Sequence, residues 1–221
     1  MKSITQILMT RFVTHEVKQF VVQRPENFSC LPGQGVLVAI NQPGLEKDWH
    51  PFTPTSLADD KVLEFTIKGY PHGGMTEKLH RLNVGDELWL GKVFGTILYK
   101  GPGVFIAGGA GITPFMAIFR QLYRNNQLAG NSLLFSNKTH ADIIAEKEMS
   151  HYLGQNCIFT LTRESVAGYQ HGRINRDFLL KQLKSFDRRF YLCGPEKFVE
   201  DCSDSLKTLG AHSDSIVFEE E

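Results

Sequence analysis

The chain has 221 residues, of which 42% are apolar and 22% charged, and its 24 lysines and arginines balance its 24 acidic residues to a formal net charge of +0. This balance argues against a nucleic-acid-binding protein, which usually carries a basic excess. No uncharged apolar run of about 18 residues is available to span a membrane, and the N-terminus lacks the apolar core of a signal peptide. We therefore expect no membrane partner.

The four cysteines, Cys30, Cys157, Cys193 and Cys202, are far apart and form no C-x-x-C pair. This spacing argues against zinc, an iron–sulfur cluster or a disulfide framework, so we expect no metal site. Reduced thiols in a cytoplasmic protein are the simplest interpretation.

The first hundred residues contain short segments rich in β-branched and aromatic residues, separated by turn residues. The expected strands are 4–12, 17–23, 35–40, 61–70, 86–91 and 95–99. Short strands at this spacing favour an antiparallel barrel or sandwich. One helix is expected at 75–83, where Met75, Leu79 and Leu82 would share one face.

After the segment KGPG the pattern changes. Apolar strands are expected at 104–108, 133–136, 158–162, 190–194 and 215–218. They alternate with helices that would begin near Pro114, Ala141, Arg176 and Pro195. This alternation is typical of a parallel sheet covered by helices. The length suits two domains of about 100 residues each, and we place them at 1–100 and 101–221.

The segment FIAGGAGITPF joins the first of these strands to its helix. Gly108, Gly109 and Gly111 permit positive φ and let a ligand approach the main chain without a Cβ in the way. Thr113 would cap the helix and Pro114 would fill its first position. The N–H groups at such a helix start bind phosphates. Because the third glycine of G-x-G-x-x-G is absent, a tight turn without a ligand remains an alternative.

Two further segments repeat this pattern. In YLCGPEKF, the strand ends at Cys193 and Gly194, and Pro195 would open a helix that Gly210 ends. Its expected buried face is Phe198, Val199, Cys202, Leu206 and Leu209. In the first half, YPHGGMTEKL places glycines and a threonine at the start of the expected helix. Two such cradles suggest two nucleotides that meet between the domains.

In order and spacing, these motifs resemble the ferredoxin–NADP reductase superfamily, and the similarity covers nearly the whole chain. The matching motifs are LPGQ at 31–34, HPFTPTS at 50–56, GGMT at 73–76, GGAGITP at 108–114 and CGP at 193–195. The resemblance implies an N-terminal antiparallel FAD-binding β-barrel followed by a parallel-sheet α/β domain that binds NAD(P).

The resemblance also implies particular roles for residues. Thr53 would place its hydroxyl near flavin N5 and Cys193 would lie beside the nicotinamide, so both count as catalytic; a buried structural cysteine is the alternative for Cys193. The family's flavin motif has arginine and tyrosine where this chain has His50 and Phe52. Since histidine lacks a permanent charge, we expect weaker FAD binding than in the family, and FMN stays an alternative.

The implied flavin contacts are His50, Pro51, Phe52, Thr53, Ile67, Lys68, Gly73, Gly74, Met75 and Thr76. The implied nicotinamide-nucleotide contacts are Gly109, Ala110, Gly111, Thr113, Asn137, Lys138, Arg163, Arg173, Cys193, Gly194 and Pro195. Arg163 and Arg173 resemble phosphate partners of NADPH-using relatives, which favours NADP over NAD; solvated surface arginines are the alternative.

Asp142 is interpreted as a first-turn helix residue, and Lys68 could be a solvated strand-edge lysine. Phe218 or Glu219 could lie near the flavin.

The expected function is therefore electron transfer from NADPH through FAD to a separate carrier, ferredoxin or flavodoxin, by a monomeric enzyme. An NADH-dependent flavin reductase or an oxygenase reductase component is the enzymatic alternative. From a different class, a flavin-free nucleotide-binding module remains possible because of His50 and Phe52.

Overall fold

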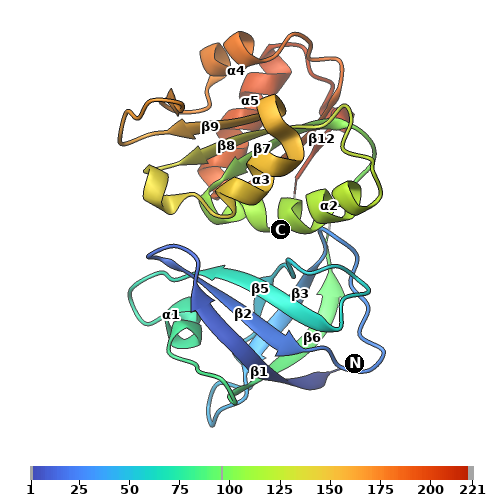
Figure 1. Cartoon of the computed structure of the whole chain (residues 1–221), viewed down its shortest axis with the longest axis vertical. Helices are drawn as coiled ribbons and strands as arrows, with labels where there is room; N and C mark the ends of the chain where they lie inside the picture. The colour runs from blue at the N-terminus through green and yellow to red at the C-terminus, as the bar shows by residue number, and fades with distance from the viewer. Residues whose placement is uncertain (1, 96, 219–221) are drawn as a thin grey trace.

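The structure is a computed structural model that describes residues 2–95 and 97–218, and its two halves are stacked along the long axis (Figure 1). The first half is an antiparallel sheet in the order β4-β3-β6-β1-β2-β5. Its strands are β1 (Ser3–Phe12), β2 (Val17–Gln23), β3 (Gly35–Ile40), β4 (His50–Phe52), β5 (Val62–Lys68) and β6 (Glu87–Phe94). An isolated antiparallel bridge between Pro54 and Phe65 joins the segment after β4 to β5, at the opposite edge of the sheet.

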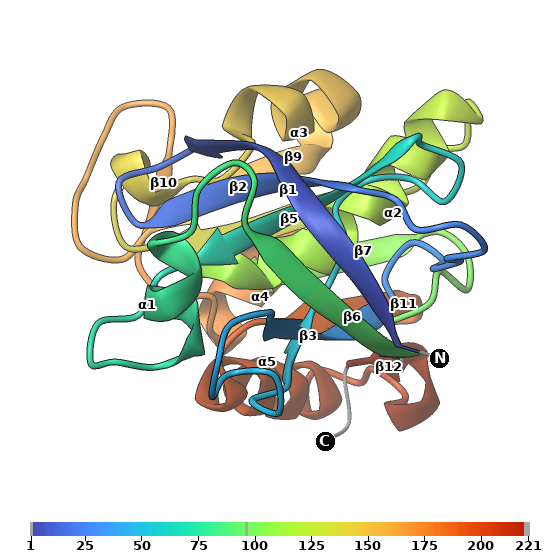
Figure 2. The same cartoon turned by 90° about the horizontal axis from the view of Figure 1, so that it is seen from below.

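The core of the first half lies inside this curved sheet and beneath α1 (Met75–His80). Met75, Leu79 and Leu82 are 3%, 0% and 4% exposed, so all three are buried as expected, but the helix ends at His80 and Leu82 follows it instead of lying on its face. The Lys18 ammonium donates hydrogen bonds to the carbonyls of His80 and Leu82 at the end of this helix. A cation there complements the negative end of the helix dipole. Seen from below, α1 lies at one side of the first sheet (Figure 2).

The second half is a parallel sheet in the order β10-β9-β8-β7-β11-β12. Its strands are β7 (Gly103–Gly108), β8 (Ser132–Asn137), β9 (Cys157–Leu161), β10 (Gln170–His171), β11 (Arg189–Cys193) and β12 (Ile216–Val217). The helices are α2 (Thr113–Arg124), α3 (Glu146–Leu153), α4 (Arg176–Gln182) and α5 (Glu196–Thr208). Over the described residues, no helix combines the length and the apolar character that crossing a membrane requires.

Side chains of β7 alternate between two cores, one on each face of the parallel sheet. Phe105 and Ala107 pack in the core beneath α2 and α3. Val104 and Ile106 pack in the core beneath α4 and α5. The chain runs from β7 outward to β8 on one side and later returns to β11 on the other. In such sheets ligands bind at the carboxyl ends of the strands where this reversal occurs, which places the site beside β7 and β11.

Some expected elements are wrong in detail. In the expected strand 95–99, Gly95 and residues 97–99 are irregular, because the chain passes there from one sheet to the other. This passage packs closely on the turn before β3, since a Cβ on Gly33 would lie 1.9 Å from the Ile97 carbonyl oxygen. The helix expected near Ala141 is a short 3₁₀ turn, His140–Asp142, and α3 begins only at Glu146. The short strands β4 and β10 were not expected.

Candidate functional site

The loop after β7 is shaped by contacts with the end of β11. A Cβ on Gly111 would lie 2.3 Å from the Cys193 carbonyl oxygen, and Cβ atoms on Gly108 and Gly194 would lie 3.0 and 2.8 Å from the Phe198 ring. Gly109, with φ of 53°, is the one glycine of this loop with positive φ. Gly108 and Gly111 do not use the positive φ that glycine permits; they instead allow two strand ends to approach each other.

The helix after this loop begins earlier than the sequence suggests. A 3₁₀ turn, Gly109–Ile112, runs directly into α2. Thr113 lies inside the helical run, and its hydroxyl donates to the Ala110 carbonyl at 3.1 Å, so the predicted N-cap role is wrong. The N–H groups that lack partners within a helix are its first ones. Here they belong to the Gly109 turn at the end of β7.

A cavity of about 430 Å³, the interface cavity, is enclosed by residues from both halves. From the first half it is lined by Gly35, Pro51, Phe52, Thr53, Thr66, Ile67, Lys68, Tyr70, Thr76 and Phe94. From the second half it is lined by Gly108, Ala110, Gly111, Thr113, Pro114, Cys193, Gly194 and Pro195. The two residues predicted to be catalytic, Thr53 and Cys193, thus face one cavity, as do the helix starts at Thr76 and Thr113.

A second cavity of about 310 Å³, the sheet-end cavity, continues from the first over the carboxyl ends of β7 and β8. The residues that line both are Lys68, Tyr70, Gly108, Ala110 and Pro195. Gly109, Asn137 and Lys138 line the sheet-end cavity alone. Asn137 is 5% exposed, yet neither its amide nitrogen nor its amide oxygen has a hydrogen-bond partner. A buried polar group of this kind is costly unless a ligand or water satisfies it.

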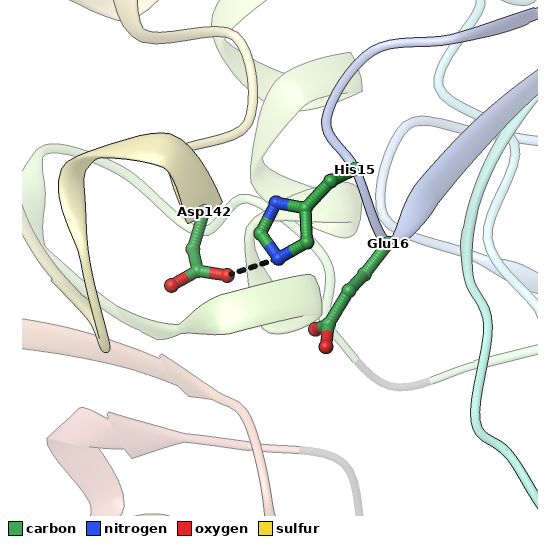
Figure 3. A group of neighbouring side chains, drawn as sticks. All are labelled: His15, Glu16 and Asp142. Carbon is green, nitrogen blue, oxygen red and sulfur yellow. Dashed lines mark ion pairs between the residues drawn. The ribbon is translucent and has the colours of Figure 1, made fainter.

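A cluster of His15, Glu16 and Asp142 borders the sheet-end cavity and joins the two halves (Figure 3). His15 Nε2 lies 3.6 Å from the Asp142 carboxylate. The Lys68 ammonium lies 2.7 Å from Glu16, and this contact lowers the pKa of Glu16. Lys68 is therefore an ion-paired residue of the cavity wall rather than a solvated lysine. Its charge also competes with any metal ion for the Glu16 carboxylate.

Asp142 is fixed by its own short turn. Its carboxylate accepts hydrogen bonds from the Thr139 N–H at 2.8 Å and from the Thr139 hydroxyl at 2.6 Å, which forms a capping box. Burial would raise the pKa of Asp142, but these hydrogen bonds outweigh it and the pKa lies below its usual value. The residue is the helix-start residue that the sequence indicated, on a 3₁₀ turn instead of an α-helix.

The glycine cradle of the first half is open and carries an anion of its own chain. Cβ atoms on Gly73 or Gly74 would have nothing within 4 Å. The Gly73 N–H donates to the Glu77 carboxylate at 2.5 Å, and Arg81 pairs with the same carboxylate. The Thr76 hydroxyl accepts a hydrogen bond from the Tyr70 N–H at 3.1 Å. The cradle thus has the geometry to hold an anionic group, with Glu77 as its competitor.

Several predicted binding residues line neither cavity. They are His50, Gly73, Gly74, Met75, Arg163 and Arg173. His50 lies 2.8 Å from Asp48, which also contacts Lys78 at 3.4 Å. Met75 is a core residue, and both arginines are exposed. Phe218 packs against the core beneath α4 and α5, and Glu219 lies outside the described residues.

Sequence reasoning missed Thr66, which is 6% exposed and lines the interface cavity from β5. It lies between Phe65 and Ile67, which pack in the core. A buried threonine between core positions was the available signal, because a polar side chain on a mostly buried strand needs a partner.

Comparisons with known proteins agree with this architecture. The family model described as "Oxidoreductase FAD-binding domain" matches residues 5–99, and "Oxidoreductase NAD-binding domain" matches 105–204. The chain belongs to the ferredoxin–NADP reductase superfamily. In this superfamily member, the interface cavity lies where the two matched domains meet. The expected fold, an antiparallel flavin-domain sheet followed by a parallel α/β sheet, is confirmed.

Three relatives illustrate the similarity. NADH-cytochrome b5 reductase 2-A of Vanderwaltozyma polyspora is 27% identical over 219 residues, which cover 89% of this chain and 72% of that protein. The CS-b5R domains of human Ncb5or in the NAD+ form match with a TM-score of 0.85 and 25% identity, over 99% of this chain and 69% of that one. A ferredoxin NADP+ reductase from Neisseria gonorrhoeae with bound FAD and NADP shares the fold, with a TM-score of 0.86, 21% identity and coverage of 99% and 97%.

The curated relatives are longer than this chain. Among the similar cytochrome b5 reductases, the chain spans between 60% and 89% of the relative's length. The two family models establish membership of the superfamily and the two kinds of nucleotide-binding domain. The activity, the nicotinamide nucleotide and the partner are matters for a proposal.

Proposed function

We propose that this protein is a flavin-dependent oxidoreductase that takes electrons from NADH into bound FAD and delivers them to a separate electron-carrier protein. The observation that carries the proposal is the interface cavity, in which Thr53 from the FAD-binding half faces Cys193 from the NAD-binding half. Two ring systems held there from opposite sides would be in the contact that a transfer between them requires.

The residues present fit an FAD on the first-half side of the cavity. Phe52 offers an apolar ring, Thr53 and Thr66 offer hydroxyl groups, and the Gly73 and Gly74 backbone leaves space for a phosphate. Bound FAD and NADH would supply the chemistry itself, a hydride transfer between their rings. The protein would hold the rings in place and exclude water from between them.

The residues of the sheet-end cavity fit a nicotinamide nucleotide. The turn at Gly109 presents helix-start N–H groups, which suit a phosphate. The unsatisfied amide of Asn137 can both donate to and accept from such a ligand. Cys193 and Pro195 would flank the ring at the border between the cavities.

We propose NADH as the donor, in place of the NADPH that the sequence favoured. Arg163 and Arg173, the expected partners of a 2′-phosphate, are exposed and lie outside both cavities. Lys138 does line the sheet-end cavity, but so does the carboxylate of Asp142, which would repel a phosphate. The names of the curated relatives support the same choice, since they use NADH.

The acceptor is proposed to be a small electron-carrier protein. The relatives are named for cytochrome b5 or for ferredoxin, both of which are electron-carrier proteins. These names support the class of partner but not any one carrier protein. Ferredoxin or flavodoxin as the acceptor, a cytoplasmic location and a monomeric state stay predictions from the sequence.

The test begins with the colour of the purified full chain. We expect protein that is yellow, or that becomes yellow with added FAD, and that reduces an artificial dye faster with NADH than with NADPH. Colourless protein that FAD cannot reconstitute would favour the flavin-free nucleotide-binding module instead. A clear preference for NADPH would contradict the choice of NADH as donor but would still agree with the proposed reductase activity.

A variant of Asn137 tests the nucleotide site. We expect Asn137→Ala to raise the KM for NADH about tenfold, because one or two hydrogen bonds of about 1 kcal/mol each are lost. Asn156→Ala, on the exposed 3₁₀ turn Gly154–Asn156, is the matched control and should leave the KM unchanged. Equal KM values for the two variants would show that Asn137 does not bind the nucleotide.

A further inference from the structure

Arg120 of α2 makes a set of contacts that crosses from the second half to the first. Its guanidinium donates to the Glu148 carboxylate of α3 at 2.6 and 2.9 Å, in a bidentate arrangement. The same guanidinium donates to the Glu64 carboxylate of β5 and to the Thr55 carbonyl, both at 2.6 Å. A planar fork of this kind fixes the direction of its partners as well as their distance.

This contact is shielded from water. The side chains of Arg120, Glu64 and Glu148 are 20%, 20% and 26% exposed. Burial would raise the pKa of Glu64, but the charge of Arg120 outweighs it and the pKa lies below its usual value. The Thr55 hydroxyl also donates to the Glu64 carboxylate, at 2.7 Å. Glu64 therefore stays ionised, and loss of Arg120 would remove the cation that the Glu64 and Glu148 carboxylates share at the interface.

A second interdomain ion pair gives a contrast on the same helix. Arg124 donates to the Asp59 carboxylate at 2.7 and 2.9 Å, with side chains that are 44% and 66% exposed. Exposed pairs contribute little because water and salt screen them. Of these two arginines, Arg120 is the one whose contact is protected enough to set the relative position of the halves.

The Arg120 contact connects the two sides of the interface cavity. On the first-half side, Thr55 lies two positions after Thr53, and its hydroxyl lies 3.3 Å from that of Thr66; both Thr53 and Thr66 line the cavity. On the other side, α2 continues without a break from the Gly109 turn to Arg120, about 10 Å along the helix from Thr113. The helix lies along the junction of the halves in Figure 1.

We propose that Arg120 is a positioning residue: through Thr55 and Glu64 it holds the Thr53 segment of the flavin half in one alignment with the nucleotide-binding turn at the other end of α2. This inference rests on the proposed function for its effect on the reaction. The alignment itself is a property of the fold and can be measured separately.

The experiment compares Arg120→Gln, Arg120→Lys and the control Arg124→Gln in the full chain loaded with FAD. We expect Arg120→Gln to slow anaerobic flavin reduction at saturating NADH about tenfold or more, because small misplacements of reacting groups are costly. The Kd for NADH should change much less. Arg120→Lys should recover part of the rate, and Arg124→Gln should match the wild type.

Calorimetric unfolding supplies a readout that does not depend on the reaction. We expect one transition for the wild type and for Arg124→Gln, and two separated transitions for Arg120→Gln, because the halves would no longer unfold together. If Arg120→Gln does not fold, Glu64→Gln removes the charge of the Glu64 partner from the first-half side, while the hydrogen bonds of Arg120 to Thr55 and Glu148 stay in place. If the wild type does not react with NADH, the proposed function fails. The number of unfolding transitions in the wild type and in Arg120→Gln then still tests whether Arg120 holds the two halves in one alignment.

The inference is overturned if Arg120→Gln unfolds in one transition and keeps the wild-type rate at saturating NADH. It is also overturned if Arg120→Gln and Arg124→Gln lose rate to the same extent, since that would show a general effect of charge at the interface. A loss confined to the Kd for NADH would assign Arg120 to nucleotide binding and would contradict its role in alignment.

Discussion

The two glycine segments that precede α1 and α2 look alike in sequence and differ in how they are held. Before α2, Gly111 is fixed against the Cys193 carbonyl, and the turn leads into a helix of 12 residues. Before α1, Gly73 and Gly74 have open space around them, and the helix has 6 residues. In the second half the shape is set by packing of the chain on itself. In the first half, the Gly73 N–H is engaged by the Glu77 carboxylate, which an incoming anion would have to displace.

This difference indicates different roles for identical residue types. A glycine that allows two strand ends to meet is needed for folding, whether or not a ligand binds. A side chain at Gly74, whose φ is −71°, would meet nothing in the folded state, whereas the φ of 79° at Gly73 disfavours any side chain there. The second-half segment is therefore shaped by packing, and the first-half segment leaves open space beside its N–H groups.

The largest effect is expected for Gly111→Ala. The added methyl group would lie 2.3 Å from the Cys193 carbonyl oxygen, and backbone atoms cannot move aside as a flexible side chain can. We expect the free energy of unfolding to fall by about 3 kcal/mol, the upper range for overpacking. Urea unfolding measures this. A loss below about 1 kcal/mol would show that the strand ends can separate at little cost.

An intermediate effect is expected for Glu77→Ala. The variant frees the Gly73 N–H, and removing one competing hydrogen bond should raise the affinity for FAD severalfold. Asp201→Ala, which breaks the exposed pair with Lys197 on α5, is the control and should leave FAD affinity unchanged. Fluorescence titration of the apoprotein with FAD distinguishes the two. Weaker binding by Glu77→Ala would mean that Glu77 supports the cradle rather than competing for it.

The same contact predicts a pH dependence. The Gly73 N–H, then the Arg81 pair, lower the pKa of Glu77 below its usual value. A carboxyl with a lowered pKa contributes stability above its unfolded pKa and loses it as the pH falls through the folded pKa. Protonation of Glu77 therefore weakens its hold on the cradle, and FAD affinity of the wild type should rise in that acidic range relative to Glu77→Ala.

The smallest effect on stability is expected for Gly74→Ala. Its φ is −71° and a Cβ there meets nothing within 4 Å, so the free energy of unfolding should change by less than about 0.5 kcal/mol. FAD retention on a desalting column should nevertheless decrease, because the methyl group occupies space left for a phosphate. If the free energy of unfolding falls as much in Gly74→Ala as in Gly111→Ala, the two glycine segments do not differ in the way described.

Local patterns predicted most of the fold. Runs of β-branched and aromatic residues between turns predicted most of the strands, and the spacing of Met75, Leu79 and Leu82 predicted residues that are at most 4% exposed. These successes share a cause, since periodicity and turn residues report on neighbours along the chain. The meeting of Thr53 and Cys193 in one cavity is instead what the resemblance to the ferredoxin–NADP reductase superfamily implies.

Other features depend on contacts between distant residues and were not accessible from the sequence. The role of Gly111 depends on Cys193, which local reasoning cannot place beside it. Thr113 matched a helix cap, but the 3₁₀ turn before it extended the helix. Arg163 matched a phosphate ligand, yet it is exposed outside both cavities. Nothing in the local sequence singles out Arg120, because its partners lie on other elements.

The most direct test of the two-cofactor cleft is anaerobic mixing of the FAD-loaded protein with NADH that carries deuterium at the transferred position. The account predicts that the visible absorption of the flavin bleaches within the single turnover and that deuterium slows this bleaching. Flavin that stays oxidised with excess NADH, in protein shown to bind both nucleotides, would contradict it.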